Sequence, residues 1–490
     1  MLAPVAGQPA DRRRELTLAA CIIGSSLAFI DATVVIVALP TIEADLGLGL
    51  SGQQWVFLSY SLALASLYLV AGSIGDRFGR RGAFAAGAAG FALASVLAGA
   101  APNGETLIAA RALQGIAGAF LTTNSLALIR SVYGDDAGRA IGLWTAFTSI
   151  ATIAGPPAGG AIVQWTSWRW IFFLNLPLAA LTVVLAQAGR CEERRAVRVG
   201  RLDLPGAGLA AIGFGSLTYG LVEGAERGFG EYWWAFALAA AALAGFVLVE
   251  RRVAEPMLPF ALFRRGNLAA ANLETFLVYG AIYGFFVYVA LHIQTLGFSP
   301  FETGLVLAPP SLVLVALATR FGALADRHGP RLYLTAGPLL IGAGCLLTLP
   351  IESRGDFWVA GTASLAVFSL GLAMLVAPIT AVALKSAPAE LAGVASGVNA
   401  TVSRLGSLTS VAVIGLVVSL VYSARTDADA EPLTTGLEGD ALAASISGFR
   451  AGMLVAAGLA FAGAAVGALA ISNREARGPK ATPEPAPAGS

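Results

Sequence analysis

Two charged residues lie inside long apolar stretches of the chain, where charge is costly and usually serves a function. Asp31 lies in the apolar stretch 16–40, about 15 residues and hence roughly 22 Å from its start. Arg111 lies in the stretch 105–130, which runs the opposite way and places it roughly 21 Å from the same side. A carboxyl group that gains or loses a neighbouring cation releases or takes up a proton. We therefore expect Asp31 to be a proton or cation site adjusted by Arg111; the alternative is a static ion pair joining two helices.

A second charged pair is expected in the C-terminal part of the chain. Glu274 lies in the apolar stretch 268–292, and Arg404 lies in the stretch 394–422. Together they are candidates for a second polar pair in proton or substrate coupling. The alternative is that Glu274 extends its side chain to the membrane interface.

Polar and aromatic side chains in these stretches are candidates for a substrate cavity. The stretch 268–292 is rich in aromatic residues, among them Tyr279, Tyr283 and Phe286, and Gln114 is assigned to the same cavity. Rings on a cavity wall hold flat lipophilic or cationic compounds through stacking and cation–π contacts. The alternative is that these rings face lipid or pack in a core.

A ten-residue pattern occurs twice, from Gly72 to Arg81 and again, 250 positions later, from Gly322 to Arg331. Gly, Asp, Arg, Gly and Arg recur in the same register, and each copy lies between two apolar stretches. A duplicated charged loop between membrane spans indicates a chain built from two homologous halves, an architecture typical of transporters.

We expect these two repeat loops to act as gates. Gly72 and Gly322 would let helices pack closely. Asp76 and Asp326 would stand at the start of the following helix and meet its positive dipole, while the arginines would bridge to acids of the other half. The alternative is that the arginines only set the membrane topology. The gating residues expected from the pattern are Gly72, Asp76, Arg77, Arg80, Asp326, Arg327 and Arg331.

A cluster of glycine and proline, Gly155, Pro156, Gly159 and Gly160, lies in the apolar stretch 138–164. Proline removes a helix hydrogen bond and kinks a span, and glycine lets another helix approach. We expect a kink here that seals the outer side against leak and favours exchange over symport. A kink that serves packing alone is the alternative.

The elements that must position these residues are membrane-spanning helices. The chain is 57% hydrophobic and 12% charged, about half the charged fraction of roughly 25% in soluble domains. Each apolar stretch is about 20 residues or longer, enough to cross a ~30 Å hydrocarbon core as a helix. We count fourteen at roughly 16–40, 54–74, 82–101, 105–130, 138–164, 169–188, 205–223, 232–250, 268–292, 303–323, 331–350, 357–379, 394–422 and 449–471.

The repeat and the arginines give the organisation and the orientation. Because the second repeat loop follows the tenth stretch, two stretches must be inserted between two six-helix bundles. The expected domains are an N-terminal bundle (1–189), a two-helix insert (190–265), a C-terminal bundle (266–472) and a disordered cytoplasmic tail (473–490). Arginines gather in alternate loops, which places both termini in the cytoplasm.

Other classes of partner are disfavoured. The net charge of +1 gives no reason to expect nucleic acid. Three scattered cysteines and two histidines make a metal site unlikely to form, and no phosphate-binding glycine loop is present. We therefore expect no cofactor, with energy from a proton gradient rather than ATP, and a monomer whose partners are a small lipophilic substrate, protons and the lipid bilayer.

Four motifs together resemble the major facilitator superfamily, in particular its fourteen-span drug:proton antiporter branch. They run from Phe29 to Pro40, Gly72 to Arg81, Arg111 to Gly118 and Gly155 to Gly160, in the family's order and spans. One departure is Ile36, which stands where the family pattern often has Asn. The resemblance covers nearly the whole chain and implies an all-α fold of two pseudo-symmetric six-helix bundles plus two inserted helices.

The resemblance also implies a function. It predicts a proton-coupled antiporter, not an enzyme, that exports lipophilic and sometimes cationic drugs or toxic compounds by alternating access across a bacterial cytoplasmic membrane. Spans 1 and 4 line the central cavity in the resembled fold. The alternatives are export of an endogenous metabolite, antibiotic or lipid, a non-transporting scaffold or sensor, and an uptake symporter.

Overall fold

The computed structural model of the protein describes residues 8–189, 203–253, 266–386, 392–426 and 430–473. Within these ranges the chain is helical and contains no strand. This agrees with an apolar sequence that must satisfy its backbone hydrogen bonds internally. Outside the described residues lie the expected tail (473–490), apart from its first residue, and the loops before and after the expected insert (190–202 and 254–265).

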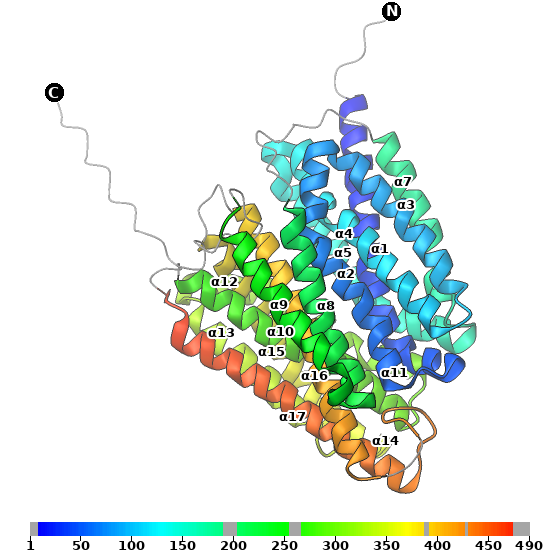
Figure 1. The fold of residues 1–490 in the computed structure, drawn as a ribbon. Helices are drawn as coiled ribbons and strands as arrows, with labels where there is room; N and C mark the ends of the chain where they lie inside the picture. Colours follow the sequence, from blue (N-terminus) through cyan, green and yellow to red (C-terminus); the bar gives the residue numbers. More distant parts are fainter. Residues whose placement is uncertain (1–7, 190–202, 254–265, 387–391, 427–429, 474–490) are drawn as a thin grey trace, which may run out of the picture.

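Seven helices form the N-terminal half, in which α1 packs against α5 and α7, and α4 packs against α2 and α3 (Figure 1). A short 3₁₀ turn (Gly134–Asp136) joins α4 to α5. These helices are α1 (Gln8–Leu46), α2 (Gly49–Phe78), α3 (Arg80–Gly99), α4 (Gly104–Tyr133), α5 (Ala137–Trp165), α6 (Trp170–Phe173) and α7 (Asn175–Ala188).

The C-terminal half is a second packed group, in which α10 contacts α16 and α17, and α13 contacts α15 and α17. A π-helical turn (Phe357–Gly361) links α14 to α15. The helices of this half are α10 (Gly266–Thr295), α11 (Pro300–Val306), α12 (Ala308–His328), α13 (Arg331–Leu346), α14 (Arg354–Asp356), α15 (Thr362–Lys385), α16 (Ala392–Ser423) and α17 (Gly439–Ala470).

Two further helices, α8 (Leu204–Arg227) and α9 (Phe229–Glu250), form an inserted pair that packs together. Helix α8 also contacts α2 of the N-terminal half and α16 of the C-terminal half, and Figure 1 shows it in green between them. Trp55 of α2 donates a hydrogen bond to Glu223 of α8 over 2.9 Å. The inserted pair is therefore a bridge between the halves.

Among the residues that the structure describes, twelve segments of helix are long and apolar enough to cross a membrane, and a thirteenth is added if α2, bent by 50° after Tyr68, is one span. Of the fourteen expected spans, the eleventh, 331–350, is not confirmed. Its helix α13 ends at Leu346 after 16 residues, which is about 24 Å at 1.5 Å per residue, shorter than a ~30 Å core. The fold is thus a multi-pass helical membrane protein with twelve or thirteen candidate spans.

Both repeat loops end their preceding helix in the same way. Gly79 follows α2 with a φ of 111°, and Gly329 follows α12 with a φ of 98°. Side chains other than glycine's are strained in this region. The glycine at the eighth position of each copy is therefore explained by a backbone turn that both halves share.

Candidate functional site

A closed polar network surrounds Asp31 in the interior of the N-terminal half. Nη1 of Arg111 donates to Oδ2 of Asp31 over 2.5 Å, and the two side chains are 0% and 1% exposed. The other carboxylate oxygen accepts from Nδ2 of Asn175 at 3.0 Å and from Nε2 of Gln114 at 3.3 Å. The pairing expected from the matched depths of Asp31 and Arg111 is present, with two further donors.

Ser95 of α3 completes this network. Its hydroxyl accepts from Gln114 at 2.8 Å and from Asn175 at 3.3 Å, and donates to the carbonyl of Phe91 at 2.7 Å. Gln114 also accepts from Arg111 at 2.8 Å. Gln114 is fully buried and bonded within the network in this conformation, and its place in a substrate cavity stays a prediction.

Arg111 is held on its remaining sides by α2 and α6. Its Nε donates to the carbonyl of Val56 at 3.1 Å, and the guanidinium lies 4.5 Å from the ring centre of Tyr60 and 5.8 Å from that of Phe172. Only Nη2 lacks a hydrogen-bond partner. The network lies among helices of one half and is closed to the space between the halves in this conformation.

Two members of the network, Ser95 and Asn175, were missed in the sequence. The available signal was the one that found Asp31: a polar residue within an apolar stretch. Asn175 carries the stronger signal, because an amide inside a span needs hydrogen-bond partners. Ser95 carries little signal, because serine can bond its own helix backbone.

The expected pair of Glu274 and Arg404 does not form. Both carboxyl oxygens of Glu274 are buried without a hydrogen-bond partner. Helices α10 and α16 do touch at this level, since a Cβ on Gly406 would lie 2.2 Å from the carbonyl oxygen of Phe276. Glu274 and Arg404 each precede these contact residues by two positions, which turns each side chain about 200° away from the contact.

The expected aromatic residues divide between two environments. Tyr283 faces the N-terminal half, with its ring 6.2 Å from that of Phe57 of α2. Phe286 lies edge-on to Phe368 at 5.8 Å, within the C-terminal half. Tyr279 is half-buried. Among these three residues, Tyr283 is the one whose ring contacts a ring of the other half in the described part of the chain.

The repeat loops differ from expectation in two ways. Asp76 and Asp326 lie in the last turn of α2 and α12 rather than at the start of the next helix, because those helices continue to Phe78 and His328. Gly72 and Gly322 are also not close-packing positions. A Cβ there would lie 3.9 and 3.4 Å from its nearest neighbour, an ordinary contact.

Close packing at the first repeat loop occurs instead at Gly75. A Cβ on this residue would lie 1.6 Å from Oδ1 of Asn124 in α4. Asn124 in turn donates to the carbonyl of Ala71 at 3.1 Å. The closest packing of α2 against α4 is therefore at Gly75, about one turn after Gly72, where the pattern predicted it.

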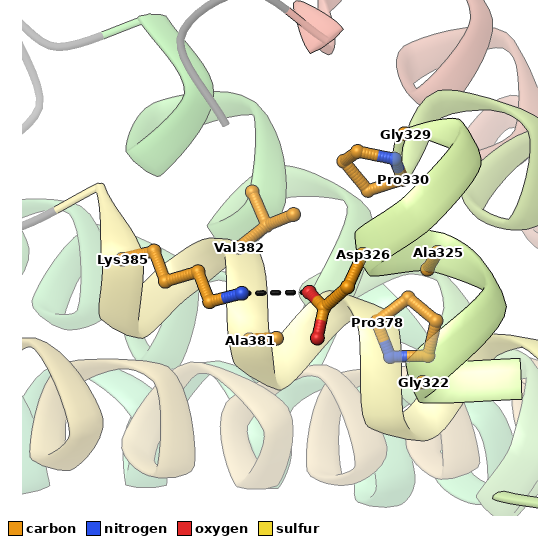
Figure 2. A pocket seen from close by; sticks show the side chains of 9 residues that line it. All are labelled: Gly322, Ala325, Asp326, Gly329, Pro330, Pro378, Ala381, Val382 and Lys385. Atoms are coloured by element: carbon orange, nitrogen blue, oxygen red, sulfur yellow. Dashed lines mark hydrogen bonds and ion pairs between the residues drawn. The ribbon is translucent and has the colours of Figure 1, made fainter. Parts of the chain in front are cut away.

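Each repeat acid forms an ion pair within its own half. Asp76 pairs with Arg80 at 2.7 Å. Asp326 pairs with Lys385 of α15 at 2.6 Å, across a cavity of about 210 Å³ between α12 and α15 (Figure 2). Arg77 lies 5.7 Å from the ring of Phe78. Arg81 is buried and donates to the carbonyl of Ala186 at 2.6 Å within its own half. Bridges from Arg77 and Arg80 to acids of the opposite half remain a prediction, as do gating roles for Arg327 and Arg331.

The glycine and proline cluster lies where α5 meets its neighbours. Helix α5 continues unbroken through Pro156 and Pro157. A Cβ on Gly155 would lie 2.2 Å from Oγ1 of Thr33, and one on Gly159 would lie 2.6 Å from Val34, both in α1. These glycines therefore join α5 to α1 within the N-terminal half.

Gly160 instead meets the C-terminal half. A Cβ on Gly160 would lie 2.3 Å from the carbonyl oxygen of Pro300, and a Cβ on Gly304 would lie 2.2 Å from that of Pro156. Helices α5 and α11 thus cross backbone to backbone through one glycine from each half. The nearby Gln164 accepts a hydrogen bond from the backbone of Phe301 at 3.2 Å.

A second contact between the halves was not expected from the sequence. Gln54 of α2 donates to the hydroxyl of Tyr288 at 2.7 Å, and Tyr288 donates to the carbonyl of Val411 at 2.6 Å. A Cβ on Gly415 would lie 1.4 Å from the Gln54 amide, so glycine is required there. Gln294 also donates to the carbonyl of Val37 at 3.0 Å. Together with the α5–α11 crossing, these bonds hold the halves together.

No group of three or more His, Cys, Asp or Glu side chains in the described ranges is arranged to hold a metal ion.

Comparison with known proteins agrees with the helical fold. A bacterial homologue of the lysosomal transporter Spinster, solved in an inward-facing and unoccupied conformation, has a TM-score of 0.66 at 18% identity, covering 94% of this chain and 97% of that chain. A D-xylose–proton symporter has a TM-score of 0.65 at 13% identity. At these identities the likeness concerns the fold alone.

Comparison of sequences places the chain in a family. The multidrug resistance protein Stp of Mycobacterium tuberculosis is 35% identical over 422 residues, which cover 85% of this chain and 78% of Stp. The tetracenomycin C resistance and export protein of Streptomyces glaucescens is 33% identical over 82% of this chain and 76% of its own. The Major Facilitator Superfamily model matches residues 21–411. The chain belongs to this superfamily of membrane transporters, which are not enzymes, and these relatives are named for drug resistance and export.

Proposed function

We propose that the protein is a proton-coupled antiporter that exports lipophilic compounds. The observation that carries this proposal is the network around Asp31. An acid inside a membrane protein is retained at a cost, and Asp31 is held by Arg111, Gln114 and Asn175, which all donate to it. In the coupling that we propose, Asp31 exchanges its proton when its bond to Arg111 loosens.

The transport cycle that we propose is alternating access between two halves. The conformation described here has α5 and α11 in contact, with Gly160 and Gly304 at their crossing. Separation of these helices would open one face of the protein as the other closes. Protonation of Asp31 would favour one of the two arrangements by weakening the contact between α1 and α4.

The finer topology also belongs to this proposal. Fourteen spans arranged as six, two and six require α13 to act as a short span that the turns after Leu346 complete. The domains are then 1–189, 190–265 and 266–472, with both termini on the cytoplasmic side of a bacterial inner membrane. Glu274 and the repeat loops would contribute to coupling and gating.

Export of a compound made by the cell itself is the second candidate. The names of two relatives favour it: the tetracenomycin C resistance and export protein, and a probable actinorhodin transporter of Streptomyces coelicolor, which is 34% identical over 84% of this chain. A scaffold or sensor without transport would not need an acid and a base buried in the same network. A symporter would move protons and substrate in one direction, which the assay below detects.

Proton movement in energised inside-out vesicles tests this function. Ethidium, chloramphenicol and 2-naphthoate represent cationic, neutral and anionic compounds, and export of any of them would release protons from the vesicle. Asp31→Asn should abolish this release. Asp45→Asn is the matched control, because Asp45 is also an α1 carboxylate paired with an arginine, Arg169 at 2.7 Å, but is 46% exposed. Equal release by wild type and Asp31→Asn would contradict the proposal.

A further inference from the structure

Arg404 is an arginine within a span whose charge no acid neutralises. It lies 12 residues into α16, a helix of 32 residues, about 18 Å from its start. No ion pair or side-chain hydrogen bond engages its guanidinium among the residues that the structure describes. Since an unpaired charge at this depth is costly, it is expected to serve a ligand or a pathway.

The guanidinium of Arg404, from the C-terminal half, contacts the N-terminal half. Its central carbon is 5.7 Å from the ring centre of Tyr68 in α2. A guanidinium over an aromatic face keeps its N–H edge free for a carboxylate, to which it donates two parallel hydrogen bonds. The unoccupied edge of Arg404 is thus suited to a planar anion between α2 and α16.

An apolar cavity of about 160 Å³ lies between the same helices, one helical turn from Arg404 and Tyr68, which are not part of its lining. On α16 its wall includes Thr401 and Leu405, and on α2 it includes Ala65, so each helix contributes residues within one turn of Arg404 or Tyr68. Oγ1 of Thr401 is buried without a hydrogen-bond partner. The cavity therefore offers an apolar volume with an unused polar group, and the cation lies one turn away along α16.

The inserted pair closes the cavity on its remaining side. Ala210 and Phe214 of α8 and Phe246 of α9 are part of its lining. The site is thus composed of all three parts of the chain: α2 of the N-terminal half, α16 of the C-terminal half, and the bridge between them.

We propose that this site binds amphipathic acids, with the apolar body in the cavity and the carboxylate on Arg404. The proposal rests on the export function above and gives its substrate class. It assigns the selection of substrate to Arg404 in the C-terminal half and leaves proton coupling to Asp31. It also gives the inserted pair a role as one wall of the substrate site.

Binding to purified protein in nanodiscs tests the proposal without a proton gradient. The probes share one two-ring scaffold: 2-naphthoate, its methyl ester and 2-naphthylmethylamine. Equilibrium dialysis against empty nanodiscs removes the contribution of lipid partitioning. The native protein should bind the acid at least about tenfold more tightly than the ester, the ratio expected for a charge-assisted hydrogen-bonded pair.

Four variants separate the effect of charge from the effect of shape. Arg404→Gln should lose the preference for the acid, and Arg404→Lys should keep part of it. Arg425 lies just beyond the end of the same helix and donates a hydrogen bond to Ser447. The control Arg425→Gln should bind the three probes like the native protein. Ala210→Phe should weaken all three probes alike, because it fills the cavity.

The proposal is overturned if the native protein binds the acid no more tightly than the ester, or if Arg404→Gln keeps the native preference. It is also overturned if Arg425→Gln loses the preference as fully as Arg404→Gln. The native comparison alone decides the matter should a variant fail to fold. Acid preference without any proton release would instead contradict the antiport function and leave the site in place.

Discussion

The buried polar residues of the two halves follow opposite rules. In the N-terminal half, Asp31 and Arg111 are joined with Gln114, Asn175 and Ser95 into one network. In the C-terminal half, Glu274 and Arg404 lie on neighbouring helices and turn away from each other, and neither has an ion-pair or side-chain hydrogen-bond partner among the described residues. A closed network resists change until a proton alters its charge, whereas an unpartnered group is available to a ligand. The difference indicates that the two halves divide coupling and recognition between them.

Replacing the arginine of each half should give the largest difference in the free energy of unfolding. Arg111→Leu leaves a buried, uncompensated carboxylate and should lower the free energy of unfolding by about 3–5 kcal/mol. Arg404→Leu loses only a stacking contact and should change it by less than about 1 kcal/mol. Unfolding equilibria in mixed detergent micelles measure both values, and equal destabilisation would contradict the contrast between the halves.

The glycine crossing between the halves gives the next largest effect. Gly160→Ala places a methyl group against the carbonyl of Pro300, and such overpacking destabilises the contact by about 1–3 kcal/mol. We expect a faster collapse of an imposed pH gradient in proteoliposomes. Gly142→Ala is the control, because a Cβ on Gly142 of the same helix has no neighbour within 4 Å. A leak equal to that of the control would remove Gly160 from the seal.

A single hydrogen bond between the halves should give a smaller shift. Tyr288→Phe removes the hydroxyl that links Gln54 to the carbonyl of Val411, at a cost of about 1 kcal/mol. The halves should then separate more often at this contact. Spin labels on α2 and α16 would report a broader distance distribution, and an unchanged distribution would show that the bond does not hold the halves.

Glu274→Gln should have the smallest effect on stability. The carboxyl group has no hydrogen-bond partner to lose, so the free energy of unfolding should change by less than about 0.5 kcal/mol. Its role in coupling is a separate question. An altered set of exported compounds in cells would assign Glu274 to the site, and an unchanged set would remove it.

Depth along a span could be read from the sequence, but rotation about the helix axis could not. The uniform rise of a helix placed Asp31 and Arg111 at one level, and they meet. Glu274 and Arg404 were expected to pair only because each is a charged residue within a span, and α10 does touch α16 near them through Phe276 and Gly406. The expected pair nevertheless fails because both side chains point elsewhere, which depends on neighbours that one sequence does not specify.

The repeat loops show a similar limit, because their sequence did not predict where the preceding helices end. The duplicated pattern, combined with the count of apolar stretches, predicted both loops and the two inserted stretches. It did not locate the end of α2 or α12, which is fixed by the positive φ of Gly79 and Gly329. A glycine that turns the backbone and a glycine that admits a neighbour are identical in the sequence. That is why Gly72 was chosen and Gly75 was missed.

The most direct test measures proton release and acid binding side by side in Asp31→Asn and Arg404→Gln. If coupling and recognition are divided between the halves, Asp31→Asn loses proton release and keeps the preference for 2-naphthoate over its methyl ester. Arg404→Gln loses that preference while its Asp31 network, and hence its stability, is unchanged. Loss of both properties in folded Asp31→Asn protein would contradict the division and place recognition and coupling in one site.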